Sequence, residues 1–351
     1  MSVDAARERS APRPTIHDVA ERAQVSPMTV SRVLSGGPNV RAELRERVEQ
    51  AAADIGYRRN ENARSLRPGH RSGLIGVTIT NIANPYYAEM QRGIEEVAAE
   101  HSRRILVGNS NEDASLEAQL IADFLGRQVE GLIVVPSGSG GSRHLTAAAL
   151  GGVPLAFASR AVEGIDVDTV LIDDVGGALE ATSRLLDEGH ERIAFLGNRV
   201  SVFTGRRRLR GFRDAHSDRD IPVAEELVRV GQQDVGSAEV AMAELLALPN
   251  PPTAVFSANN RNTIGAIRAI EAAKRRRGGG SAVPPIRLFG FDSFEFADLS
   301  PVPLSVIAHD ARELGRRAAE MLFERLDGDE ADVPARLVEL PVYVQTTPSP
   351  S

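Results

Sequence analysis

The stretch TIHDVAERAQVSPMTVSRVL, residues 15–34, predicts two short helices joined by a tight turn at Gln24-Val25. Apolar residues at helical spacing mark one face of each helix: Ile16, Val19, Ala20 and Ala23 in the first, and Val30, Val33 and Leu34 in the second. Thr15 and Ser26 are suited to cap the two helices, because a hydroxyl can accept a backbone N–H of the first turn. Pro27 follows Ser26 at the first helical position, where its missing N–H has no cost. A unit of this kind can place its second helix in a DNA groove.

A third helix is expected after this pair, because two helices this short bury too little surface to hold a core. Residues 41–55 supply it, and Gly56 is suited to end it. Its buried side is expected to consist of Leu44, Val48, Ala51, Ala52 and Ile55. The alternative is a plain helical bundle with a polar face, and the charge distribution and the rest of the chain argue against that.

The composition limits the classes of protein to which the chain can belong. Its 351 residues suggest two or three domains. It contains no cysteine, which excludes disulfides and thiolate metal sites. No apolar run reaches the ~18–20 residues of a membrane span, and the N-terminal MSVDAARERSAPRP lacks the apolar stretch of a secretory signal. We therefore expect a cytoplasmic, nucleoid-associated protein without membrane contact.

Charge is unevenly distributed along the chain. The net charge is −7, but residues 1–71 carry 13 Arg against 9 Asp and Glu, which leaves −11 for the remainder. A basic head on an acidic body is the layout of a DNA-binding module joined to a separate ligand or partner domain. We therefore expect the helical head to be the basic part and to contact double-stranded DNA.

The connector at residues 60–71 is the second informative stretch. Asn62 to Leu66 allow little more than one helical turn before Pro68, and a helix that short is unstable alone in water. A flexible basic linker is one interpretation. The other rests on Leu66 beside Arg67, since an apolar side chain in a basic setting is suited to enter the minor groove, unstack a base step and bend the duplex.

From residue 72 onward, apolar strands alternate with amphipathic helices. Strands are expected at 73–79, 104–110, 131–137 and 154–159, with helices at 85–101, 115–127 and 143–150. The pattern begins again with helices at 175–188, 204–216, 236–246 and 261–274 and strands at 192–198, 226–231, 254–259 and 286–292. Continuous apolar strands of this kind indicate parallel sheets covered on both faces. The expected fold class is α/β, with a three-helix helix-turn-helix head and a two-lobed body of doubly wound parallel sheets.

Polar residues at the ends of these strands are candidates for a binding site, because open α/β sheets bind ligands at the carboxyl ends of their strands. The candidates are Tyr86, Tyr87, Ser159, Arg160, Arg208, Asn259 and Asp292. Asp, Asn and Arg side chains that converge from different strands suit pairs of hydroxyl groups, as in a carbohydrate. Arg206 and Arg207 beside Arg208 leave two alternatives open, namely a phosphorylated or acidic ligand and a solvated helix face.

Two other classes of protein fit the sequence poorly. None of the seven His has a metal-binding spacing, SGSGGS at 137–142 lacks the Lys-Ser/Thr of a phosphate loop, and no Ser lies in a GxSxG motif. We therefore expect no enzyme, cofactor or metal. A solute-binding protein of a transporter would explain the body but not the head, and the chain shows no export signal.

Together these motifs resemble the LacI/GalR family of bacterial transcription regulators. The matching residues are Asp18-Val19-Ala20, Val25-Ser26, Thr29 to Leu34, Gly56-Tyr57 and Ala63 to Arg67. The resemblance implies that the second helix enters the major groove, that Leu66 is inserted at the operator centre, and that the body has the periplasmic sugar-binding fold. The positions it assigns to DNA contact are Thr15, Ser26, Pro27, Met28, Thr29, Ser31, Arg32, Asn39, Asn60, Ala63, Leu66 and Arg67. The candidate cleft residues match the family's effector-contacting positions.

Side-chain chemistry suggests a division of roles on the second helix. Arg32 suits a guanine, Met28 and Pro27 suit a thymine methyl group, and Ser26 and Thr29 suit phosphates. One head makes few contacts, so we expect a homodimer on a near-palindromic operator, with a central CG step by resemblance. The expected function is a repressor controlled by a sugar or sugar-like effector. The angle between the two lobes of the body would decide whether the connectors of the two subunits, residues 60–71, pair with each other as helices.

The resemblance also implies that the chain passes between the lobes three times. We expect a disordered tail at 1–13, the head at 14–59, the hinge at 60–71, a first lobe of 72–171 and 304–333, and a second lobe of 172–303 and 334–346. In this scheme 304–330 returns to the first lobe as a helix, and 335–346 adds a last strand to the second. Residues 274–285 are expected to form a surface loop.

The sequence departs from the family at four places. Gln24 stands in the turn where many members have Gly or Asn, and we expect strain there because Gln tolerates a left-handed backbone less well. Ser159 replaces an Asp of several sugar-binding members, and Val235 replaces a stacking aromatic residue of others. Asn259-Asn260 replaces the commoner Asn-Asp. The differences at Ser159 and Val235 remove two frequent sugar contacts and indicate a pocket of shifted specificity.

Overall fold

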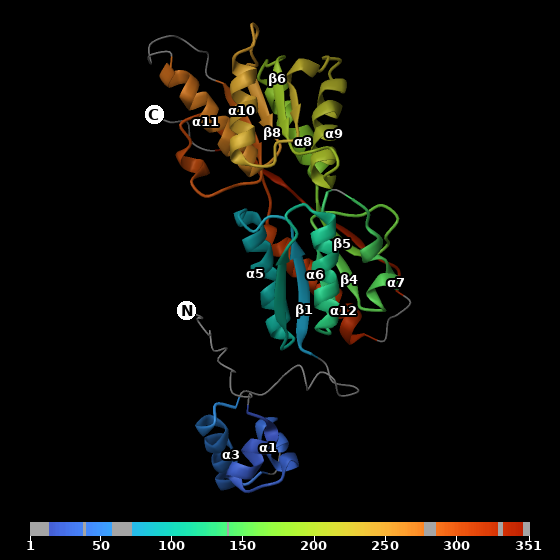
Figure 1. The fold of residues 1–351 in the computed structure, drawn as a ribbon. Helices are drawn as coiled ribbons and strands as arrows, with labels where there is room; N and C mark the ends of the chain where they lie inside the picture. Colours follow the sequence, from blue (N-terminus) through green and yellow to red (C-terminus); the bar gives the residue numbers. More distant parts are fainter. Residues whose placement is uncertain are drawn as a thin grey trace, which may run out of the picture. The chain divides into compact units, whose positions relative to one another are not determined.

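The computed structural model describes residues 14–37, 40–57, 72–138, 140–276, 286–328 and 333–346. The chain divides into two compact units, Met1–Arg71 and Ser72–Ser351 (Figure 1). Five positions expected to contact DNA lie outside the described residues: Asn39, Asn60, Ala63, Leu66 and Arg67. The tail at 1–13 and residues 277–285 of the expected surface loop also lie outside them, whereas Lys274 to Arg276 end a helix.

The first unit contains three helices, α1 (Ile16–Ala23), α2 (Pro27–Leu34) and α3 (Ala42–Asp54). Their small core is built from the apolar positions that the sequence singled out, with Val19, Val30 and Val48 fully buried. Residues 41–55 therefore form the expected third helix, and it is one residue shorter at each end.

The ends of α1 and α2 have the expected chemistry. Thr15 caps α1 and shares a reciprocal capping box with Asp18, and Ser26 caps α2 by accepting the N–H of Thr29 at 3.1 Å. Gln24, in the turn, adopts the left-handed conformation, with φ 51° and ψ 48°. Because only glycine adopts this backbone without cost, the expected strain at Gln24 is present.

The first lobe of the second unit is a six-stranded parallel sheet. Its strands, in spatial order, are β11 (Leu337–Leu340), β5 (Asp168–Ile172), β4 (Leu155–Ala158), β3 (Gly131–Val134), β1 (Leu74–Ile79) and β2 (Arg104–Asn109). Helices α5 (Pro85–Glu100) and α12 (Ala311–Asp327) pack together on one face. The other face is covered by α6 (Ala114–Gly126), the 3₁₀ turn η1 (Arg143–Leu145) and α7 (Ala147–Leu150).

The second lobe repeats this architecture. Its sheet has the order β12 (Tyr343–Thr346), β10 (Leu304–Ala308), β9 (Arg287–Phe291), β8 (Ala254–Ser257), β6 (Ile193–Gly197) and β7 (Val228–Val230), with only β12 antiparallel. Helices α8 (Asp174–Asp187) and α9 (Phe203–Ser217) cover one face, and α10 (Val235–Leu246) and α11 (Asn260–Arg276) cover the other (Figure 1). Short 3₁₀ turns are η2 (Glu225–Leu227) and η3 (Ala297–Leu299). The two-lobed α/β fold predicted from the sequence is confirmed.

The structure corrects the sequence interpretation near the C-terminus. Residues 304–308 form strand β10 of the second lobe and not the start of a helix, because their apolar side chains are buried on both faces beside β9. The helix begins only after Asp310, which caps α12. Residues 335–346 are not one strand: β11 pairs with β5 in the first lobe, and β12 pairs with β10 in the second.

Two smaller differences concern the first lobe. Strand β5 was not expected, and the expected helix at 143–150 is divided into η1 and α7. The chain passes between the lobes three times, between β5 and α8, between β10 and α12, and between β11 and β12.

Candidate DNA-binding helix and ligand pocket

Helix α2 presents an outer face that combines one exposed apolar side chain with several polar ones. Met28 is 71% exposed, and Arg32 is also exposed and makes no ion pair within the described residues. Ser26 and Thr29 are bound to each other through their hydroxyls at 2.9 Å, and Pro27 and Ser31 are partly exposed. At the start of α1, the Thr15 hydroxyl accepts the N–H of Asp18 at 3.4 Å and donates to the Asp18 carboxylate at 2.8 Å, so it caps the helix.

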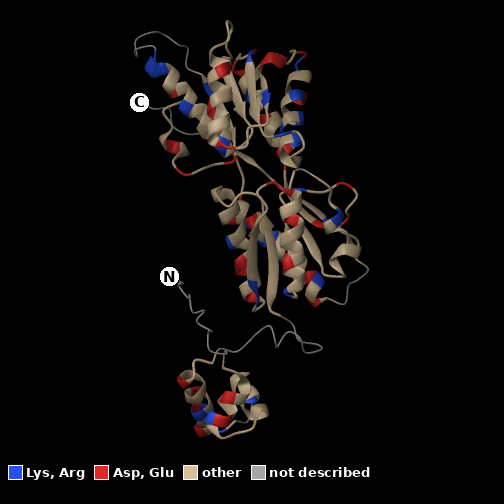
Figure 2. Ribbon diagram, viewed as in Figure 1, with Lys and Arg blue, Asp and Glu red and all other residues tan. Residues whose placement is uncertain are grey.

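The three helices themselves are not basic, contrary to the expectation for the head. Within residues 14–57 there are five arginines against six Asp and Glu, mixed over the surface (Figure 2). One of these arginines, Arg22, is paired with Asp54 at 2.9 Å and ties α1 to α3. The basic excess comes mainly from residues 58–71, which hold five arginines and one glutamate and lie outside the described residues.

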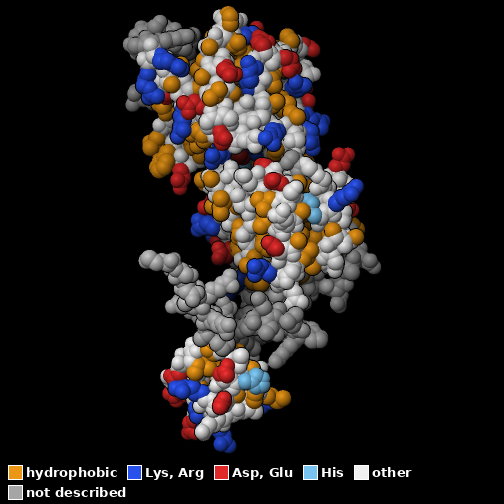
Figure 3. Space-filling view, in the orientation of Figure 1, with side chains coloured by type: hydrophobic (Ala, Val, Ile, Leu, Met, Phe, Trp, Pro, Cys, Tyr) orange, Lys and Arg blue, Asp and Glu red, His pale blue; other side chains and the backbone are white. Residues whose placement is uncertain are grey.

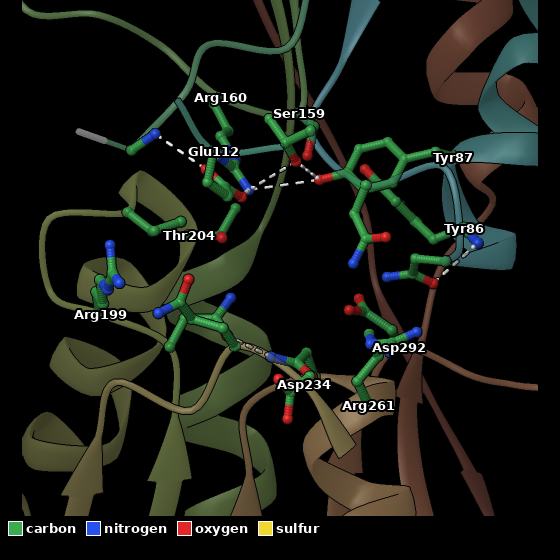
Figure 4. Close-up of a pocket in the computed structure, with 18 of the residues that line it drawn as sticks. Tyr86, Tyr87, Glu112, Ser159, Arg160, Arg199, Thr204, Asp234, Arg261 and Asp292 are labelled. Atoms are coloured by element: carbon green, nitrogen blue, oxygen red, sulfur yellow. Dashed lines mark hydrogen bonds and ion pairs between the residues drawn. The ribbon is translucent and has the colours of Figure 1, made fainter. Parts of the chain in front are cut away.

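A pocket of about 420 Å³ lies between the two lobes of the second unit. All seven candidate residues chosen from the sequence line it: Tyr86, Tyr87, Ser159, Arg160, Arg208, Asn259 and Asp292. Figure 4 shows side chains of both lobes pointing into this space, with Arg160 and Ser159 opposite Asp234 and Arg261. On the face shown in Figure 3, charged and apolar side chains are interspersed over both lobes.

The ends of the strands hold several pocket residues in an unusual backbone conformation. Ser159 follows β4 with φ 67°, and Asp292 follows β9 with φ 64°. After β2, Asn111 and Glu112 have φ 51° and 61°. Left-handed conformations of residues other than glycine are costly and concentrate at functional sites, so the fold holds these four side chains in place at some cost.

In the first lobe, a buried arginine is paired with a glutamate that the sequence interpretation missed. Arg160 donates to both carboxylate oxygens of Glu112, at 2.8 and 2.7 Å, and also to the carbonyl of Pro136. Glu112 further accepts the N–H of Gly138 at 3.0 Å. Burial alone would raise the pKa of Glu112, but the hydrogen bonds and charge of Arg160 outweigh burial and lower it. The pair is therefore ionised at neutral pH.

In the second lobe, Arg208 holds two carboxylates together. Its guanidinium donates to Asp174 at 2.8 Å and to Asp292 at 3.1 Å, and it lies 3.7 Å from the centre of the Phe291 ring. His309 Nε2 lies 2.9 Å from the second oxygen of Asp292. Burial raises the pKa of Asp174, whereas Arg208 and then His309 overcome burial at Asp292 and lower its pKa. Asp292 thus faces the pocket as a fixed carboxylate.

Two tyrosines supply neutral hydroxyls at the start of α5. Burial raises the pKa of Tyr86 and of Tyr87, so both remain protonated. The Tyr87 hydroxyl is 2.7 Å from that of Thr80, whereas the Tyr86 hydroxyl has no hydrogen-bond partner within the described residues. Asn259 has a structural role as well, because its oxygen accepts the N–H of Asn262 and its amide donates to Asn198.

Other lining residues were not chosen from the sequence. They include Thr80, Asn81, Asn111, Glu112, Asn198, Arg199, Thr204, Gln233, Asp234 and Arg261. Asn111 and Glu112 follow β2 closely, and Asn198 follows β6. The rule that polar residues directly after a strand are candidates for the pocket selected Ser159, and it would also have found these three residues if applied to every strand. Val235 does not line the pocket, and Gln233 and Asp234 do.

The triple arginine 206–208 does not give the pocket a positive charge. Arg207 pairs with Glu339 and Arg208 with Asp174 and Asp292, while Arg206 lines a smaller adjoining hollow. Within the described residues, no cluster of His, Asp and Glu could hold a metal ion. The described helices also include none that is long and apolar enough to cross a membrane.

Comparison with known proteins assigns the chain to a family. Residues 15–60 match the family described as "Bacterial regulatory proteins, lacI family", and residues 72–343 match "Periplasmic binding proteins and sugar binding domain of LacI family". The chain belongs to the LacI family. It is 30% identical over 333 residues to catabolite control protein A of Priestia megaterium, covering 94% of this chain and 97% of the relative.

Solved structures of LacI-family proteins agree with both parts of the chain. The lac repressor dimer bound to operator and the anti-inducer ONPF has a TM-score of 0.77 and 26% identity, covering 95% of this chain and 98% of that one. The complex of the regulator CelR with cellobiose has a TM-score of 0.68 and 26% identity, covering 95% and 99%. This LacI-family chain is therefore a DNA-binding transcriptional regulator whose body is a sugar-binding type of domain.

Proposed function

We propose that this regulator is a repressor that binds a near-palindromic operator as a homodimer and responds to an uncharged, sugar-like effector in the inter-lobe pocket. The class of effector is inferred from the two buried arginines of the pocket, each of which is paired with carboxylates. Arg160 is neutralised by Glu112, and Arg208 by Asp174 and Asp292. An anionic effector would find both buried arginines already paired, whereas hydroxyl groups can share their ionised side chains. Arg199 and Arg261 also line the pocket and make no ion pair within the described residues, so an anionic effector is the alternative that the ligand panel must decide.

A panel of ligands compared by thermal shift tests this proposal. D-ribose and cellobiose represent neutral sugars, ribose 5-phosphate and glucose 6-phosphate represent anions, and cytidine represents nucleosides. A ligand that binds the native state raises the melting temperature in proportion to RT ln(1 + [L]/Kd). We expect a rise with a neutral sugar, and none with the same sugar in the Asp292→Ala variant. A rise produced by the phosphorylated sugars alone would contradict the proposed effector class.

The proposed operator contacts lie on α2 and on the connector. Arg32 and Met28, exposed on the outer face of α2, would contact bases, while Ser26, Thr29 and Ser31 would contact phosphates with Thr15. Binding selection from random duplexes is expected to return two inverted half-sites around a central CG step. Recovery of single asymmetric half-sites would contradict the dimeric arrangement.

Control of DNA binding would come from the lobe angle. A coupling free energy of typical size, about 1–3 kcal/mol, corresponds to a 5- to 150-fold change in operator affinity. Titration of a fluorescent operator with and without the sugar found in the thermal-shift panel measures this factor. A factor of one would show that the pocket does not control the head.

A further inference from the structure

A hydrogen bond between two asparagine side chains joins the lobes at the edge of the pocket. Asn84 precedes α5 in the first lobe, and Asn260 is the first residue of α11 in the second. The amide nitrogen of Asn260 donates to the side-chain oxygen of Asn84 at 2.8 Å. Beside this pair, Arg261 donates to the carbonyl oxygen of Ala83 at 3.3 Å. These bonds connect the start of α11 directly to the start of α5.

The direction of the Asn84–Asn260 bond is fixed by the fold. The same oxygen of Asn84 caps α5 by accepting the N–H of Tyr86 at 3.2 Å, so this oxygen cannot exchange places with its own amide nitrogen without losing the cap. The group facing it from the second lobe must therefore be a donor. Asn260 supplies one, is only 2% exposed, and keeps its own oxygen without a partner within the described residues.

A carboxylate at position 260 has the shape of the amide but not its donor. Aspartate at this position, which is only 2% exposed, would set an acceptor oxygen against the acceptor oxygen of Asn84. The oxygen that replaced the amide nitrogen at position 260 would be a buried acceptor without a donor, and such a group costs more than a hydrogen bond contributes. The arrangement of the lobes thus depends on a carboxamide at position 260.

We propose that the Asn84–Asn260 hydrogen bond is a latch that stabilises the closed arrangement of the two lobes. Close contact elsewhere in the pocket supports a closed arrangement. A Cβ atom added at Gly138 of the first lobe would lie 2.5 Å from Val202 Cγ2 and 2.9 Å from its Cα in the second. Any side chain at position 138 would therefore push the lobes apart, because the backbone at Val202 would have to move.

The distance between spin labels on the two lobes tests the latch in the full chain. The protein has no cysteine, so Ala122→Cys on α6 and Glu244→Cys on α10, both exposed, would carry the only labels. Double electron–electron resonance of the otherwise unchanged protein should show a dominant short distance. In Asn260→Asp the closed population should fall at least threefold, with a smaller fall in Asn260→Ala and a fall in Gly138→Ala.

A matched control makes the same change of charge elsewhere in the second lobe. Asn250 is exposed, and Asn250→Asp should leave the distance distribution unchanged. Circular dichroism shows whether each variant is folded, and if Asn260→Asp does not fold, Asn260→Ala carries the test. A distribution that is the same in wild type and in the folded 260 variants, or a wild type without a short distance, would overturn the latch.

The consequence for DNA binding rests on the proposed function and is measured separately. Because coupling is reciprocal, a variant that loses the closed form should change operator affinity in the direction opposite to that produced by a sugar that closes the lobes. D-ribose and cellobiose are the probes, with the operator obtained by selection. If the label distances change and operator affinity does not, the latch stands and the proposed control of DNA binding fails.

Discussion

Replacement of Glu112 by glutamine tests whether the pocket depends on its ionised pair. Glu112→Gln keeps the shape of the side chain and one acceptor oxygen, but it removes the charge and one of the two bonds of 2.7 and 2.8 Å to Arg160. The Arg160 side chain is only 4% exposed, so water compensates little for the loss. Hydrogen bonds to charged groups contribute about 1.5–3 kcal/mol each, and we expect the second unit to be destabilised by about 2 kcal/mol at pH 7.

Differential scanning calorimetry measures this change as a lower melting temperature. About 2 kcal/mol corresponds to a decrease of roughly 3–4 °C for a unit of this size. The pH dependence has a definite sign. The pKa of Glu112 is lowered in the folded protein from 4.5, so the difference between wild type and variant should be fully present above about pH 5 and disappear as the pH falls through the folded pKa.

Glu163→Gln is the matched control, because Glu163 is exposed in the same lobe and makes no ion pair within the described residues. It should melt within about 1 °C of wild type. If Glu112→Gln also melted within 1 °C of wild type at pH 7, or if its deficit did not shrink as the pH was lowered progressively below 4.5, the Arg160–Glu112 pair would not have the energetic role derived from its geometry.

Three further substitutions test the pocket, the cap of helix α2 and the connector one at a time. Asp292→Ala should abolish the effector response and spare operator binding, because the carboxylate lies in the pocket. Operator titration with and without the sugar measures this response. A response retained in the variant would show that Asp292 is not part of the effector site. Ser26→Ala should cost about 1 kcal/mol by uncapping α2, visible in the full chain as roughly fivefold faster hydrogen exchange of the α2 amides. Equal exchange rates would contradict the cap. Leu66→Ala should weaken selected-operator binding much more than binding to a random duplex, and equal losses by fluorescence anisotropy would refute the wedge.

Local patterns predicted the features that depend on neighbours along the chain. The caps at Thr15 and Ser26, the left-handed Gln24 and the polar strand ends at Ser159 and Asp292 were all visible in the sequence, since each follows from a residue type at one place in an element. The candidate pocket was assembled in this way, by the rule that parallel strands end at a common edge.

Features that depend on distant partners were missed. The position of Glu112 soon after β2 makes it a candidate, but its pairing with Arg160 is visible only in the structure, and His309 is identified only by its contact with Asp292. The mostly apolar sequence of residues 304–308 fits either a helix or a buried strand, and only the pairing with β9 shows that it is a strand. β11 is a short edge strand of alternating exposure. Its sequence does not indicate which lobe it joins, and only its pairing with β5 places it in the first lobe.

The three passages of the chain between the lobes determine the order in which the protein can assemble during translation. The first lobe is completed only by α12 and β11, and the second only by β12, so neither has its full sheet until the last strand has left the ribosome. The three-helix head, by contrast, is complete within the first 57 residues. A nascent or prematurely terminated chain would therefore carry a finished DNA-binding unit on an unfinished sensor, and its single head would have only the few contacts of one half-site.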